Sequence, residues 1–150
     1  MYNVRLMMSK TGNAKYISHL DMFRLCERAV RRAGLPVWYT EGFNPHPYIS
    51  FLLALPLGVE AVAEPVDIRL NSKMTEDEII AAFNSVLPRG VKIVGAKEPV
   101  MKPAELAFGV WSVLLDRSEI TAEELKKALD SGSLTVEKPG KVNGRKTMKT

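Results

Sequence analysis

The sequence predicts an α+β fold, in which strands and helices alternate along the chain. Residues 2–9 and 65–70 alternate apolar and polar side chains, which is typical of strands with one buried face. Three segments start with a serine or threonine that is followed three residues later by an acidic residue, which is a helix-start signal. A hydrophobic content of 46% is ordinary for a globular chain.

The first strand and the first helix have the clearest signals. Residues 2–9 are expected to form the strand and residues 10–13 a turn. Ser18 is a good N-cap, and Asp21 is placed to complete a reciprocal capping exchange. We expect the helix to extend to about Ala33, because a glycine and a proline follow.

The chain continues to alternate up to residue 100. The expected elements are extended segments at 36–40 and 49–54 around a loop at 41–47, a strand at 65–70, a helix capped by Thr75 and ended by residues 88–90, and a strand at 91–96. This βαββαβ order is the ferredoxin-like pattern, with two helices on one face of an antiparallel sheet. We therefore expect residues 1–100 to form a ferredoxin-like domain.

The pattern starts again after Pro103. The expected elements are a strand at 107–115, a helix at 121–129, a strand at 134–138, and turns at 138–140 and 143–144 within a basic hairpin. Residues 104–150 would then be the start of a second, truncated ferredoxin-like unit.

Cys26 is the only cysteine of the chain. One thiol cannot form a disulfide within the chain, and it cannot supply the ligands of an iron–sulfur or zinc–cysteine site. A reducing, cytoplasmic setting is the simplest interpretation. We expect no bound cofactor. We also expect no membrane partner, because no apolar run reaches transmembrane length.

Positive charge is concentrated in two regions. Residues 1–60 carry seven Lys or Arg and four Asp or Glu, residues 61–137 carry nine and thirteen, and residues 138–150 carry five and none. Basic regions favour anionic partners such as RNA, and a solvated surface is the competing interpretation.

One side of the first helix gathers the charge. An arc about 100° wide holds Asp21, Arg24, Arg28, Arg31 and Arg32. The other side is expected to hold Leu20, Phe23, Cys26, Val30 and Ala33. Four arginines repel one another, and Glu27 offsets this only in part, through Arg31. The arc is either a solvated face or a clamp for phosphate or carboxylate groups.

Two histidines are candidates for chemistry. His19 occupies the first helical position, where free N–H groups favour anions. His46 lies between two prolines, which restrict the backbone and would present Asn44 and His46 rigidly. Three uses are open besides a structural turn: substrate contact, an acid–base pair acting on RNA, and a metal site shared with Asp21.

The aromatic residues near the arginines have two possible roles. Trp38, Tyr39 and Tyr48 would either stack on bases or pack within the fold. The basic tail at 138–149 would either follow a phosphate backbone or form a solvated hairpin.

Two strings in the first half are more specific than these patterns. Tyr16-Ile17-Ser18-His19-Leu20-Asp21 and Gly42-Phe43-Asn44-Pro45-His46-Pro47 closely resemble the DUF2344 family, also called radical SAM-linked proteins. The signature falls here on Lys10, Tyr16, Ser18, His19, Asp21, Arg24, Arg28, Arg31, Arg32, Gly42, Phe43, Asn44, Pro45, His46, Pro47, Ser50, Pro56, Gly58 and Glu64. The chain departs from the family at Tyr48, where a basic residue is usual, and at Ala61, which replaces a serine.

The resemblance implies a partner, because these bacterial proteins are fused to, or encoded beside, a radical SAM protein with a B12-binding-type domain. It also implies an association with RNA, and it transfers no catalytic residues. We expect an accessory module that binds an anionic substrate, with an RNA-processing enzyme and a protein-docking module as alternatives. The expected binding residues are Lys10, Tyr16, Ser18, His19, Arg24, Arg28, Arg31, Arg32, Phe43, Asn44 and His46. In the enzyme alternative, the catalytic candidates are His19, Asp21 and His46.

Overall fold

The computed structural model describes residues 1–114, 121–131, 136–139 and 146–149. The chain divides into two compact units, Met1–Ala107 and Phe108–Thr150. Among the described residues, no helix combines the length and the apolar character needed to cross a membrane.

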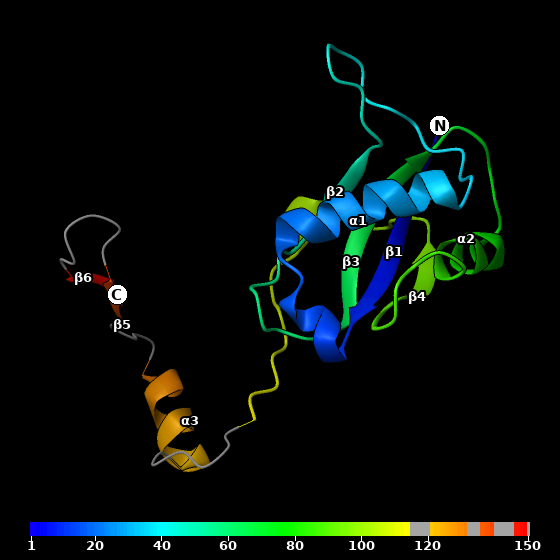
Figure 1. The fold of residues 1–150 in the computed structure, drawn as a ribbon. Coiled ribbons are helices and arrows are strands. Elements are labelled where there is room, and N and C mark those ends of the chain that lie inside the picture. Colours follow the sequence, from blue (N-terminus) through cyan, green and yellow to red (C-terminus); the bar gives the residue numbers. More distant parts are fainter. Residues whose placement is uncertain (115–120, 132–135, 140–145, 150) are drawn as a thin grey trace. The chain divides into compact units, whose positions relative to one another are not determined.

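The first unit holds a four-stranded antiparallel sheet and two α-helices (Figure 1), which confirms the α+β class. Its elements are β1 (Tyr2–Lys10), η1 (Gly12–Tyr16), α1 (His19–Arg32), β2 (Ile49–Phe51), β3 (Ala61–Leu70), α2 (Glu76–Asn84), β4 (Val91–Lys97) and η2 (Pro103–Glu105). The strand order is β2-β3-β1-β4. Each helical connection therefore skips one strand, because β3 separates β1 from β2 and β1 separates β3 from β4.

One face of the sheet and both helices share a single core. The alternating side chains of β1 and β3, such as Leu6 and Ile68, are buried there against Val30 of α1 and Phe83 of α2. The strand periodicity of two and the helical periodicity explain this arrangement, since each element buries one side only.

The helix caps lie where the sequence predicts, but the reciprocal exchange expected at Ser18 and Asp21 is not formed, because the Asp21 carboxylate accepts from the Ser18 hydroxyl and not from the Ser18 N–H. Ser18 caps α1, Ala33 ends it, and Gly34 follows with a φ of 66°. Thr75 and Glu78 form a capping box at the start of α2.

Three further local expectations were wrong. Residues 36–40 form no strand, because Val37 bridges to β3 whereas Tyr39 bridges to Pro47, so that no continuous ladder forms. Leu20 is 58% exposed, since it lies four residues before Arg24 and shares that side of the helix. Residues 107–114 have no regular structure, because no described segment pairs with them.

The second unit contains α3 (Ala122–Asp130), β5 (Val136–Pro139) and β6 (Lys146–Lys149), and the two strands pair antiparallel. Thr121 and Glu124 form a capping box at the start of α3. The strand expected at 134–138 begins at Val136 within the described residues, and the turn residues 140 and 143–144 lie outside them.

Candidate functional site

The start of α1 holds a connected polar group. Ser18 Oγ accepts a hydrogen bond from the Asp21 N–H over 3.1 Å and donates one to Asp21 Oδ2 over 2.7 Å. Arg24 Nη1 lies 3.2 Å from Asp21 Oδ1. The Ser18 hydroxyl, and then Arg24, hold the pKa of Asp21 below its ordinary value.

The exposed side of α1 presents an arginine face, defined as Arg24, Arg28, Arg31 and Arg32. Arg24 pairs with Asp21. The other three are exposed and form no ion pair within the described part of the chain, so that the expected Glu27–Arg31 pair is absent there. The positive charge of this face is therefore largely uncompensated.

His19 lies on α1 and packs against β2, whereas His46 lies outside the helix and packs against α1. The His19 ring packs edge-on against Phe51 of β2, with 5.1 Å between centroids. The His46 ring packs edge-on against Phe23 of α1 at 6.5 Å, and its Nδ1 lies 3.2 Å from the Pro47 carbonyl oxygen. Each ring thus faces a phenylalanine, and no contact joins the two histidines among the described residues.

Residues 38–48 form an antiparallel hairpin that carries His46. The Tyr48 N–H donates to the Trp38 carbonyl over 2.9 Å, and the Thr40 N–H donates to the His46 carbonyl over 2.9 Å. The His46 N–H in turn donates to Thr40 Oγ1. Phe43 and Asn44 are exposed at the tip.

The base of this hairpin packs around a cation of β3. The Arg69 guanidinium lies 5.0 Å from the Trp38 ring centroid and 4.5 Å from that of Tyr48. Arg69 Nε also donates to Asn3 Oδ1 over 3.0 Å. Trp38 and Tyr48 therefore pack within the fold, which was one of the two roles left open for them.

Lys10 and Glu64 are buried beneath α1, with relative exposures of 2% and 5%. Both side chains continue the buried alternation of their strands, β1 and β3. In the described residues, every side-chain nitrogen or oxygen sealed from solvent has a hydrogen-bond partner. Neither Lys10 nor Glu64 has a hydrogen bond or an ion pair, so the polar tips of both side chains reach solvent.

The burial of these groups changes their acidity. Burial raises the pKa of Glu64 to about 7, although the nearby Lys10 opposes this. Burial, and then the charge of Glu64, raise the pKa of Cys26 to about 12, so this thiol stays protonated at neutral pH. Lys10 was expected in an exposed binding surface, and its burial removes most of its side chain from that surface.

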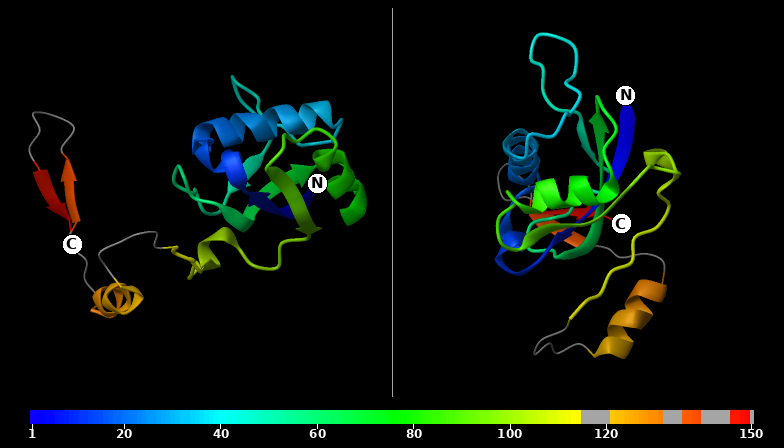
Figure 2. Two further views of the ribbon diagram at one scale, coloured as in Figure 1. Left: turned by 60° about the horizontal axis from the view of Figure 1, so that its bottom comes forward. Right: turned by 90° about the vertical axis from the view of Figure 1, so that its right-hand side faces the viewer.

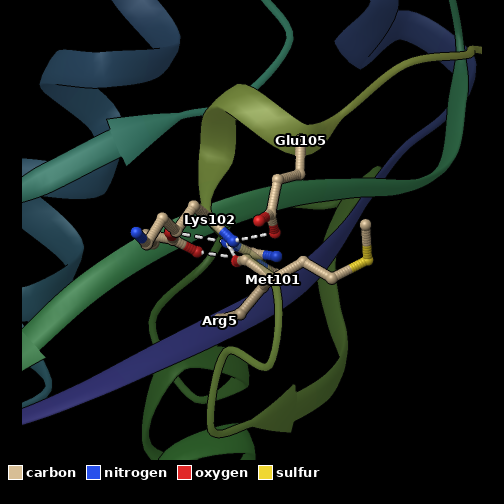
Figure 3. Close-up of polar contacts among 5 residues, drawn as sticks. Arg5, Met101, Lys102 and Glu105 are labelled. Atoms are coloured by element: carbon tan, nitrogen blue, oxygen red, sulfur yellow. Dashed lines mark hydrogen bonds and ion pairs between the residues drawn. The ribbon is translucent and has the colours of Figure 1, made fainter.

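The outer face of the sheet has its own ion pair, which Figure 3 shows. The Arg5 guanidinium donates to both carboxylate oxygens of Asp67, at 2.7 and 2.9 Å. It also donates to the Met101 carbonyl over 2.9 Å, and the Lys102 N–H donates to Glu105 Oε2 over 2.8 Å. Arg5 therefore fastens the segment after β4 to the sheet.

The site residues fall into two groups. Ser18, His19, Asp21 and the arginine face lie on α1, and His46 meets the same helix through Phe23. Tyr16, Phe43 and Asn44 are exposed away from these contacts. Within the described part of the chain, no three His, Cys, Asp or Glu side chains gather as a metal site would require. Sequence reasoning placed Glu64 in the family signature and left it out of the site, although its position in the β3 alternation signals burial.

The fold and these groups define an α+β protein with an arginine-rich helix and a buried Lys–Glu cluster. A family model described as "Uncharacterized protein conserved in bacteria (DUF2344)" matches residues 3–149, and the chain belongs to this family. Comparison with curated proteins gave no match.

Proposed function

We propose that this DUF2344 protein is an accessory module of a radical SAM enzyme, and that its arginine face binds an anionic substrate such as structured RNA. The observation that carries the proposal is the exposure of Arg28, Arg31 and Arg32 without ion-pair partners among the described residues. The proposal rests further on the electrostatics of α1, on the fold and on the single cysteine.

The stability of α1 does not by itself explain the number of arginines on its surface. Cations in the last turn, here Arg31 and Arg32, are favoured by the partial negative charge of a helix C-terminus. That effect falls off within one turn, so it does not account for Arg28. Arg24 is offset by its ion pair with Asp21, whereas Arg28 has no such partner among the described residues and is repelled by Arg24 at a spacing of four residues. A phosphate backbone removes this repulsion, and guanidinium groups bind phosphate oxygens in pairs.

We also propose that residues 1–100 form a ferredoxin-like domain. The βαββαβ order supports this, together with helical connections that each skip one strand.

The single cysteine supports a partner that carries the iron–sulfur chemistry. Clusters of this kind are held by several cysteine thiolates. Cys26 is alone, is buried, and has a pKa raised to about 12, so it is unsuited to supply even one ligand.

The salt dependence of RNA binding tests the role of the arginine face. We expect the affinity for a short RNA hairpin to fall steeply as salt rises, because binding releases counterions. Arg24→Ala or Arg28→Ala should reduce the slope of log affinity against log salt by about 0.7 to 0.9. Arg89→Ala is the matched control, since Arg89 is exposed and lies outside α1.

Three outcomes separate the proposal from its alternatives. Equal losses in Arg28→Ala and Arg89→Ala would reduce the interaction to a general effect of net charge. Absence of RNA binding at low salt, with co-purification of a radical SAM protein that depends on Arg28, would favour protein docking. Cleavage of the RNA that disappears in His19→Ala and His46→Ala would favour the enzyme.

A further inference from the structure

Phe43 lies at the tip of the 38–48 hairpin, with a relative exposure of 106%. Figures 1 and 2 show this hairpin projecting beyond the strands and helices of the first unit. Covering this ring with a partner would be favourable, because its whole apolar surface now contacts water.

The hairpin holds this ring on an ordered base. Backbone hydrogen bonds join Thr40 to His46 and Tyr48 to Trp38, and the His46 ring packs against Phe23 of α1. A partner of Phe43 would therefore meet a preorganised element, which lowers the entropic cost of binding.

Three aromatic rings nearby already have cation partners, and the fourth, Tyr39, is only 38% exposed. Arg69 lies over both Trp38 and Tyr48, and Lys15 lies 5.5 Å from the centroid of Tyr16. Phe43 has no ring or cation contact within the described residues, so both faces of its ring are free. Of the rings in the hairpin, Phe43 is thus the one best placed to receive a flat ligand.

We propose that Phe43 is a stacking platform for an unpaired nucleobase, and this rests on the proposed RNA-binding function. The substrate would be RNA with single-stranded nucleotides beside the segment that the arginine face holds. Every base offers a π face to an aromatic side chain, so this contact needs no particular sequence. Bases within a duplex already stack on their neighbours, so a fully paired RNA would gain nothing from Phe43.

The hairpin meets the helix that carries the arginine face. His46 on the second arm of the hairpin contacts Phe23, and Phe23 directly precedes Arg24 on α1. Joint binding therefore requires an RNA that contacts the arginines and continues around α1 to the hairpin, where an unpaired nucleotide would stack on Phe43.

Two RNA probes test this inference: a short mixed-sequence single strand, and the same strand within a duplex. Phe43→Ala should weaken binding of the single strand by about fivefold or more. It should change binding of the duplex by less than about twofold, because phosphate contacts remain. Phe43→Trp should keep the affinity, and the single strand should quench the fluorescence that the new indole adds. An unchanged circular dichroism spectrum would show that the variants fold.

The outcomes distinguish base stacking on Phe43 from the proposed RNA binding by the arginine face. If Arg28→Ala weakens both probes and Phe43→Ala weakens neither, the RNA-binding function stands and base stacking is rejected. Equal losses for both probes in Phe43→Ala would also reject stacking, because a paired base cannot supply the contact. If the parent protein binds neither probe at low salt, both proposals fail. Loss of a co-purifying protein in Phe43→Ala, with RNA binding unchanged, would assign the ring to protein docking.

Discussion

Glu64 and Lys10 lie on the same buried face of the sheet, on neighbouring strands, and form no ion pair with each other. Two buried charges that remain apart cannot fully offset the cost of their desolvation. The fold tolerates them because Glu64, with its pKa raised to about 7, is protonated over part of the physiological range.

The acidity of Glu64 predicts a pH-dependent stability. Its pKa rises from 4.5 in the unfolded chain to about 7 in the fold, so the folded state binds more protons between these values. Stability should therefore be lost as the pH rises from about 4.5 to about 7, by at most about 3 kcal/mol. Denaturant unfolding across this range in the parent and in Glu64→Gln measures the effect.

In Glu64→Gln this loss should disappear, and the variant should be more stable than the parent at pH 8. Lys10→Met is the matched partner variant, because it removes the charge that opposes protonation. It should move the midpoint of the stability loss to higher pH. If the unfolding free energy of Glu64→Gln depended on pH as that of the parent does, Glu64 would not be the cause of the loss.

Arg69 is expected to stabilise the base of the hairpin through Trp38 and Tyr48. Arg69→Ala should cost about 1 kcal/mol of unfolding free energy, which is typical of a cation–π contact. Because the Tyr48 N–H donates to Trp38 within this cluster, its hydrogen exchange should become faster. Unchanged exchange at Tyr48 would show that the hairpin is ordered independently of Arg69.

Ser18 has two roles, as the N-cap of α1 and as a hydrogen-bond donor to Asp21, and Ser18→Ala removes both. Ser18→Ala should cost about 1 kcal/mol, because the N-cap bond to the Asp21 N–H is lost. The pKa of Asp21 should rise toward its ordinary value, since the Ser18 hydroxyl is the main cause of its lowering. A nuclear magnetic resonance titration of Asp21 measures the second effect, and Ser18→Thr should preserve both.

Gly90 is expected to tolerate no side chain. It has a φ of 89°, and an added Cβ would lie 2.7 Å from the Thr11 carbonyl oxygen. Gly90→Ala should therefore lower stability by about 2 kcal/mol or more. Gly12→Ala is the comparison, because Gly12 also has a positive φ but has nothing within 4 Å of an added Cβ. Equal losses in thermal unfolding would mean that backbone conformation alone sets the cost.

Local signals predicted the local structure well. Ser18, Thr75 and Thr121 cap helices as their spacing to an acidic residue indicates. The alternation of β1 also indicates that Lys10 is buried, because Lys10 follows the buried residues Val4, Leu6 and Met8 at intervals of two. A charged residue at the end of such a series does not show whether the strand turns out to solvent or continues into the core.

Contacts between distant segments could not be predicted in this way. Arg69 meets Tyr48 because β2 pairs with β3, and it meets Trp38 because Val37 bridges to Leu70 of β3. Nothing near Trp38 in the sequence signals a cation. The contacts His46–Phe23 and His19–Phe51 likewise depend on how α1 crosses β2. Helical spacing did place Phe23 on the apolar side of α1, and Phe23 packs partly buried against the core.

The strand order also determines when each strand can pair while the chain is being synthesised. Among the strands of this sheet β1 is synthesised first, yet it is an inner strand whose partners are synthesised much later: Tyr2 pairs with Leu70, and Arg5 pairs with Lys97. At typical elongation rates the nascent β1 waits several seconds for β3, with the apolar side chains of its inner face unpaired. During this interval α1 is the element best able to cover the apolar face of β1, because α1 carries its own N-cap and forms through local contacts.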